Sequence, residues 1–155
     1  MTGRRNIPAA DTVDSGRPHV NPPAERFELP IAIQPGDIDQ LGHVNNVVYL
    51  RWVQDAAIAH WRATAPAADQ AKLRWIVLRH EIDYKHPALL DDEIIARTWV
   101  GTASRLAFER HTELVRRADR RVLARARTVW CPIDTQTGKP THVSDEVRTR
   151  FSIPG

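Results

Sequence analysis

Residues 36–52 carry the side chains whose types and spacing best suit chemistry on an acyl carbonyl. The stretch reads Gly-Asp-Ile-Asp-Gln-Leu-Gly-His-Val-Asn-Asn-Val-Val-Tyr-Leu-Arg-Trp. Such chemistry needs a nucleophile or a base that activates water, and hydrogen-bond donors where negative charge develops on oxygen. The apolar residues from Val47 onward indicate a helix. Asp39 precedes them by a short length of chain, which would bring its carboxylate beside the start of that helix. Free backbone N–H groups and the positive end of the helix dipole lie at that point.

Alternating and continuous apolar patterns predict the elements that position this segment. Residues 26–34 have the period of a half-buried strand, which Pro30 restricts to an edge or a bulge. Residues 47–63 lack Gly and Pro and are apolar on nearly every face, so they predict a buried helix. The ranges 75–84, 94–100, 106–114 and 122–130 alternate as long antiparallel strands. Ser144, followed by two acidic residues, predicts the N-cap of a short helix ending near Phe151.

This order of elements predicts an α+β fold, because one helix cannot cover both faces of a parallel sheet. We expect five antiparallel strands wrapped around the central helix. In 75–84, alternation places Ile76, Leu78, His80, Ile82 and Tyr84 on one face. The face away from the helix would carry several apolar residues, namely Trp99, Leu123 and Val129. Together with two free sheet edges, this predicts a homodimer or homotetramer that forms edge to edge.

The length of 155 residues favours one domain and excludes most large catalytic scaffolds. We expect a flexible tail over residues 1–24, which are rich in Pro and polar residues, and a single domain over 25–155. The chain has no G-x-S-x-G and no G-x-x-x-x-G-K-[ST] pattern, so serine-hydrolase and P-loop classes are set aside. No apolar run approaches the roughly 18 residues of a membrane helix.

The charge pattern points to a small phosphorylated ligand rather than to nucleic acid. Of 22 basic residues only Lys72, Lys85 and Lys139 are lysine, and arginine is the better phosphate partner. Acidic residues interrupt the basic ones almost everywhere, which argues against a nucleic-acid binding face. The single cysteine, Cys131, and a basic N-terminus without an apolar stretch behind it predict a cytoplasmic protein.

The pattern D-x-D-x-x-G-H-V-N-N-x-x-Y-L-x-W over residues 37–52 resembles the hotdog-fold thioesterases of the 4-hydroxybenzoyl-CoA thioesterase and acyl-ACP thioesterase group. The resemblance extends over about residues 26–151, including the turn at 134–140. It implies a hotdog fold and hydrolysis of an acyl-CoA or acyl-ACP thioester to a free acid and a thiol, without a metal or an organic cofactor. The chain departs from a common family pattern at Gln54, where many relatives have an acidic residue.

By this resemblance Asp39 is the catalytic carboxylate, acting as nucleophile or as general base, and the backbone N–H of Asn46 polarises the carbonyl. The position of His43 is associated with catalysis as well. Asn45 is a candidate for orienting the substrate or water, with the alternative that one of the two asparagines is the helix N-cap. Tyr49 is a candidate for substrate contact, with core packing as the alternative reading.

Signals elsewhere in the sequence are weaker. Arg125 and Arg127 are candidates for binding coenzyme A phosphates, with a solvated strand face as the alternative. Asp37 is expected to form a turn rather than to act in catalysis. The histidines at 80, 86 and 111 lack the spacing of a zinc site, so we expect no metal.

Two other function classes fit the resemblance. One is a hotdog module that binds acyl thioesters without hydrolysing them. The other is a hotdog dehydratase or hydratase, which the Asp-His arrangement of this segment fits less well.

Overall fold

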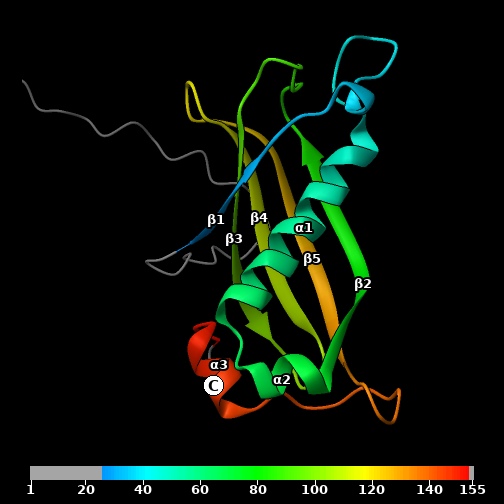
Figure 1. Ribbon diagram of the computed structural model, residues 1–155, viewed down its shortest axis with the longest axis vertical. Coiled ribbons are helices and arrows are strands. Elements are labelled where there is room, and N and C mark those ends of the chain that lie inside the picture. Colours follow the sequence, from blue (N-terminus) through cyan, green and yellow to red (C-terminus); the bar gives the residue numbers. More distant parts are fainter. Residues whose placement is uncertain (1–25, 154–155) are drawn as a thin grey trace, which may run out of the picture.

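Five antiparallel strands curve around one long helix in the computed structural model, which describes residues 26–153 (Figure 1). The strands are β1 (Phe27–Ile31), β2 (Leu73–Tyr84), β3 (Ile94–Ala103), β4 (Phe108–Arg116) and β5 (Arg121–Asp134). The helices are α1 (Asn46–Thr64), α2 (Ala67–Lys72) and α3 (Asp145–Arg150), and a 3-10 turn, η1, spans Pro35–Asp37. The predicted α+β hotdog architecture is confirmed. The predicted tail, residues 1–24, lies outside the described residues.

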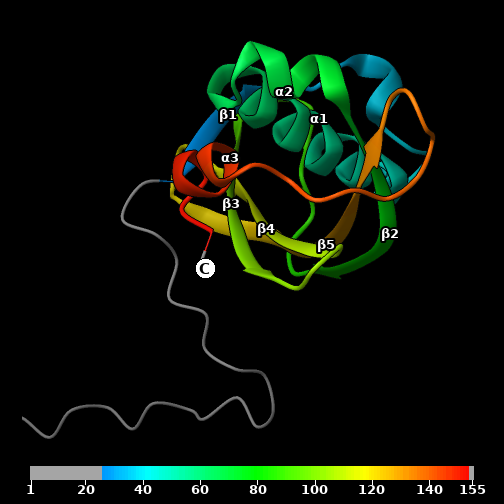
Figure 2. The same cartoon turned by 90° about the horizontal axis from the view of Figure 1, so that it is seen from below.

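The sheet has the strand order β1-β3-β4-β5-β2, and every neighbouring pair is antiparallel. β1 and β2 are therefore the two edge strands. Pro30 lies in β1, which agrees with its predicted place at an edge, where a missing N–H costs no ladder bond on the open side. Seen from below, the helices form one layer over the concave face of the sheet (Figure 2).

α1 buries one face only, which corrects the expectation of a helix enclosed on nearly every side. Its buried residues are Val48, Tyr49, Trp52, Val53, Ala56 and Ala57. Val47 and Ile58 are exposed, because a single curved sheet covers one side of the helix and no second layer formed by residues 26–153 covers the other. The apolar residues on the open side are thus free to contact a further surface.

Residues 67–72 form the short helix α2, between the predicted helix and the predicted strand at 75–84, where the sequence predicted no element. The Gln70 side chain donates hydrogen bonds to the carbonyls of Ala65 (2.9 Å) and Arg62 (3.2 Å). These bonds satisfy carbonyls at the end of α1 that have no partner within the helix. A single polar side chain therefore stabilises the turn of the chain from α1 into β2.

A β-bulge in β2 changes which side chains face the helix. The register of β2 against β5 shifts between Val77 and Arg79, so Leu78 is the extra residue. Before the bulge Trp75 contacts α1 through Trp61, and after it His80 bonds the buried Thr128. The expectation that residues 76, 78, 80, 82 and 84 share one face is therefore wrong. Ile76 and Leu78 point away from the helix and are exposed.

A second bulge explains why Leu123 is in the core and not on the outer face as predicted. The β4–β5 register shifts where Leu114 pairs with Ala124 and Val115 pairs with Val122, which leaves Leu123 as the extra residue. Leu123 is fully buried beside the residues that pack on α1. Trp99, by contrast, lies under the guanidinium of Arg26, outside this core cluster.

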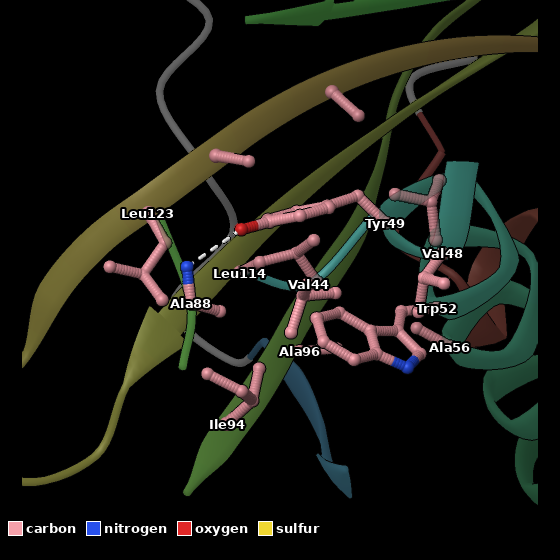
Figure 3. Packing of buried hydrophobic residues seen from close by; sticks show 13 residues of the cluster. Val44, Val48, Tyr49, Trp52, Ala56, Ala88, Ile94, Ala96, Leu114 and Leu123 are labelled. Atoms are coloured by element: carbon pink, nitrogen blue, oxygen red, sulfur yellow. Dashed lines mark hydrogen bonds between the residues drawn. The ribbon is translucent and has the colours of Figure 1, made fainter. Parts of the chain in front are cut away.

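The core has two parts, one under each half of α1. The first part lies under the N-terminal half and is drawn in Figure 3; it includes Tyr49, Trp52, Ile94, Leu114 and Leu123. The second part packs α3 against the C-terminal half through Leu73, Phe108, Val147 and Phe151. The helix start is thus held by one cluster of side chains and the helix end by another.

Candidate active site

A tight turn over residues 39–43 fixes the position of Asp39. The Asp39 N–H donates to the His43 carbonyl (2.8 Å), and the Gly42 N–H donates to the Asp39 carbonyl (3.1 Å). Gly42 has φ of 79°, a conformation that glycine adopts without steric cost. Asp39 Oδ1 accepts hydrogen bonds from the backbone N–H groups of Leu41 (2.9 Å) and His43 (3.3 Å). Within the described part of the chain nothing donates to Oδ2, which leaves this oxygen available to water or substrate.

Asp37 has a structural role, as the sequence predicted. It is 5% exposed, and its Oδ2 accepts a hydrogen bond from the Gln34 N–H (2.9 Å) while Oδ1 pairs with Arg51 (2.8 Å). Burial by itself raises the pKa of Asp37, but these hydrogen bonds and the charge of Arg51 outweigh it, so the pKa is lowered. The Asp37 carbonyl accepts from the Asn45 N–H (2.8 Å), which joins the turn to the helix start.

Asn45 is the N-cap of α1. Its side-chain oxygen accepts a hydrogen bond from the Val47 N–H (3.1 Å), so the capping alternative is confirmed for this residue. Its role in orienting substrate stays a prediction. Asn46 is the first helical residue, and across residues 26–153 we find no acceptor for its N–H. A free amide at the positive end of a 19-residue helix is a suitable donor to an oxyanion.

A hollow of about 370 Å³ brings the predicted residues together at the helix start. Its lining includes Asp39, His43, Asn45, Asn46 and Tyr49. The lining also includes four residues that the sequence did not predict as site residues: Tyr84, Lys85, His86 and Pro87. The chemistry-bearing residues of the turn therefore share one concavity with the end of β2.

The segment after β2 reaches the hollow because the backbone holds it there. The N–H groups of Lys85 and His86 both donate to the carbonyl of Leu123, the bulge residue of β5, at 2.8 and 3.1 Å. The Tyr84 hydroxyl donates to the Asn46 carbonyl (2.9 Å). Nothing in the local pattern of 84–87 indicates this position, since it depends on a long-range contact. The only signal was the polar run Tyr-Lys-His-Pro at a strand end.

Tyr49 is part of the core as well as of the hollow wall. It is almost fully buried, and its hydroxyl accepts a hydrogen bond from the Ala88 N–H (2.9 Å), drawn as a dashed line in Figure 3. Burial raises the pKa of Tyr49. The packing alternative is thus confirmed, and a contact between Tyr49 and substrate stays a prediction.

Arg125 and Arg127 do not line the hollow. Both belong to β5, where Arg127 makes ion pairs with Glu109 and, at 3.6 Å, with Glu81. Glu109 also accepts a hydrogen bond from Thr102 (2.8 Å). Arg125 is exposed and stands opposite Asp83 and Glu113 in the neighbouring strands. Their predicted role in binding coenzyme A phosphates stays a prediction, and for Arg127 it requires competition with two carboxylates.

Residues 26–153 contain no group of three or more His, Cys, Asp or Glu side chains arranged to hold a metal ion. No helix in the same range is long and apolar enough to cross a membrane.

Comparison with known proteins supports the assignment of the fold. Among solved structures, a 1,4-dihydroxy-2-naphthoyl-CoA thioesterase from Synechocystis has a TM-score of 0.71 at 18% identity, covering 83% of this chain and 96% of that one. A thioesterase from Thermus thermophilus, complexed with coenzyme A and zinc, has a TM-score of 0.69 at 24% identity, with coverage of 80% and 90%. The PA5185 protein from Pseudomonas aeruginosa has a TM-score of 0.73 at 21% identity, with coverage of 81% and 88%.

A search among curated proteins finds no match. The model of the thioesterase-like superfamily matches residues 33–151, which include the Asp39 turn, α1 and all the strands after β1. The resemblance found in the sequence is therefore confirmed at the level of the family. The chain belongs to the thioesterase-like superfamily.

Proposed function

We propose that this protein hydrolyses an acyl thioester of coenzyme A or acyl carrier protein to a free acid and a thiol. The observation that supports this most directly is the pairing, in one hollow, of a carboxylate oxygen and a helix N-terminal amide that are both free of partners within residues 26–153. The thioester carbonyl oxygen would accept from the Asn46 N–H, which stabilises the charge that develops on it.

Asp39 activates the attack on the carbonyl carbon in one of two ways. As a general base it takes a proton from water, the hydroxide adds to the carbonyl carbon, and the C–S bond breaks to release the thiolate. As a nucleophile its Oδ2 forms an acyl anhydride with loss of the thiolate, and water then hydrolyses the anhydride. A single turnover in ¹⁸O-water separates the two, because only the nucleophilic route can place ¹⁸O in the Asp39 side chain.

The comparisons favour acyl-CoA as the first substrate class to test. One structural neighbour is named for an acyl-CoA substrate, and another was solved with coenzyme A. We would measure thiol release from a panel of short, long and aromatic acyl-CoA thioesters, with acyl carrier protein thioesters in parallel. Hydrolysis of a thioester by the wild-type protein that is abolished in Asp39→Asn would support the proposal. Tight binding of the thioesters with no release of thiol would instead support a binding module.

We also propose that the working unit is at least a homodimer formed through β2. β2 is an edge strand, its exposed face carries Ile76 and Leu78, and α1 leaves Val47 and Ile58 uncovered. Pairing β2 with its copy would satisfy the open edge and cover apolar surface. Light scattering that shows a folded species of 17.6 kDa at micromolar concentration would contradict this.

A further inference from the structure

A second cavity, of about 670 Å³, lies between the C-terminal half of α1 and the sheet. Aromatic and aliphatic side chains form most of its wall: Ala57, Ile58, Trp61, Leu73, Trp75, Phe108, Trp130 and Phe151. Its size falls in the range of ordinary small-molecule sites, which is about 300–1,000 Å³. An apolar cavity of this kind suits the body of an acyl group.

Arg110 differs from the other charged residues of the lining, the exposed Arg62 and Arg74 and the half-buried Glu109, because its positive charge is buried. Its side chain comes from β4, and the residue is 8% exposed. One guanidinium nitrogen, Nη1, donates to His60 Nδ1 (2.9 Å) and to the Thr98 hydroxyl (3.1 Å). Burial lowers the pKa of Arg110 to about 10, so the group remains protonated near neutral pH.

Both partners of Arg110 are neutral. Burial, with a contribution from the charge of Arg110, lowers the pKa of His60 to about 3, so this ring accepts a hydrogen bond and carries no charge. Arg110 makes no ion pair with any carboxylate of the described chain. The nearest acid in sequence, Glu109, also belongs to the cavity lining, but its carboxylate is bound to Arg127 and Thr102 instead.

A buried cation without a counter-ion is costly, and such groups in proteins are usually paired with an anion. The planar guanidinium suits a carboxylate, to which it can donate two parallel hydrogen bonds. We propose that Arg110 binds a carboxylate at the far end of the acyl group, so that the preferred substrates are ω-carboxyacyl thioesters. This inference rests on the proposed thioester hydrolysis and adds a substrate class to it.

The position of the cavity relative to the hollow agrees with this role when two copies pair through β2. Within one copy, Asn46 and Trp61 are 15 residues apart on α1, which is about 22 Å along the helix axis. The hollow contains Tyr84 at the end of β2, and the cavity contains Leu73 at its start. Antiparallel pairing of β2 about a two-fold axis brings the end of one strand beside the start of the other. The hollow of one copy then lies next to the cavity of its partner.

The first experiment compares turnover of suberoyl-CoA, which ends in a carboxylate, with octanoyl-CoA, which ends in a methyl group. We expect the wild-type protein to favour suberoyl-CoA in kcat/KM by about 10- to 100-fold, the range of a charge-assisted hydrogen bond to a buried group. Arg110→Met should remove or reverse this preference, because it keeps an unbranched side chain but removes the charge. Arg110→Lys should retain part of it. Arg97→Met removes an arginine that pairs with Glu113 and is absent from the cavity lining, so it should leave the ratio unchanged.

The second experiment measures binding without catalysis. Trp61, Trp75 and Trp130 line the cavity, so their fluorescence should respond to a ligand there. We expect octanoate to bind more tightly than octanol to the wild-type protein and this difference to vanish in Arg110→Met. Equal binding of octanoate and octanol to the wild-type protein would overturn the inference, whether or not the variants fold. Anion-selective binding that depends on Arg110, without turnover of any thioester, would overturn the proposed hydrolysis and retain the site.

Discussion

The two halves of α1 border two cavities of different chemical character. At its N-terminus the hollow is polar and is formed from one short turn, the first helical residues and the chain after β2. At its C-terminal half the cavity is mostly apolar and is formed largely by α1, α3 and the strands of the sheet. The first region presents groups that can act on a carbonyl, and the second presents volume and a buried charge. Under the two proposals above, reaction chemistry and acyl recognition would be located at opposite ends of the same helix.

The largest expected effect of a single substitution is on the chemical step. Asp39→Asn keeps the shape of the side chain and an oxygen for the bonds from Leu41 and His43, but removes the negative charge. We predict a loss in kcat of about 10²- to 10⁴-fold with little change in melting temperature. Retention of more than a tenth of the wild-type rate of thiol release would show that Asp39 is not the catalytic carboxylate.

Asp37→Asn is the matched control, because it removes a carboxylate that lies two residues from Asp39 and has a structural role. We predict a loss of about 1–3 kcal/mol in the free energy of unfolding, measured by urea denaturation, with kcat largely retained. The lowered pKa of Asp37 also sets the sign of its pH dependence. Its stabilising contribution is complete above the unfolded pKa near 3.8 and is lost as the pH falls through the lower folded pKa. If Asp37→Asn were as inactive as Asp39→Asn at full stability, the division of roles between the two would be wrong.

His43 tests whether the hollow contains a second group that takes part in proton transfer. If its ring acts in the transition state, His43→Ala should lower kcat with a smaller change in KM, and the pH–rate profile should lose an inflection. A variant that keeps its rate and its pH profile but melts earlier would assign His43 to holding the turn. The catalytic unit would then reduce to Asp39 and the amide of Asn46.

The cavity is tested by filling it. Ala57 is buried on α1 and lines the cavity, so Ala57→Leu should occupy part of its volume. We predict a several-fold rise in KM for long acyl groups and little change for acetyl-CoA, since the hollow is untouched. Overpacking should cost about 1–3 kcal/mol in stability, so the variant is compared at a temperature where circular dichroism shows it folded. Equal losses for short and long substrates would mean that the cavity does not hold the acyl group.

The proposed dimer is tested at its edge. Leu78 is 56% exposed on β2, and Leu78→Lys places a charge where a second copy would pair. We predict a monomer in light scattering and a lower kcat/KM for long acyl groups, because the cavity of the partner is then absent. Leu89→Lys changes another exposed leucine outside the named strands and should leave the dimer intact. If Leu78→Lys and Leu89→Lys have the same oligomeric state, the interface lies elsewhere.

The sequence predicted the hollow better than the cavity, and the reason is physical. Asp39, His43 and Asn46 come together through turn hydrogen bonds over a few residues, which local spacing can indicate. Lys85 and His86 reach the same place only because they bond the carbonyl of Leu123, a contact across the sheet that no local pattern encodes.

Local patterns in the sequence likewise predicted the elements of the fold better than the faces of the strands. The helix, the strands and the N-cap at Ser144 follow from hydrophobic period and capping chemistry, and the structure confirms them. The predictions for the faces of β2 and for the position of Leu123 were wrong. In each strand a bulge adds one residue and inverts the alternation after it. Arg110 did leave a signal in the sequence, because strand alternation places it on the same face as Phe108 and Leu114. A charged residue on an apolar face does not, however, reveal which group it pairs with.

The bulge at Leu78 divides β2 into two segments whose side-chain phases are independent of each other. Deleting Leu78 would join them into one regular strand in which Trp75 and Tyr84 both still face the helix, because the partners of Val77 and Arg79 are neighbours in β5. The wall of the cavity and the bond from the Tyr84 hydroxyl to the Asn46 carbonyl would both be retained. β2 should therefore tolerate the loss of this one exposed residue at both ends of the molecule. Replacement of Leu78 by another residue leaves both phases unchanged as well.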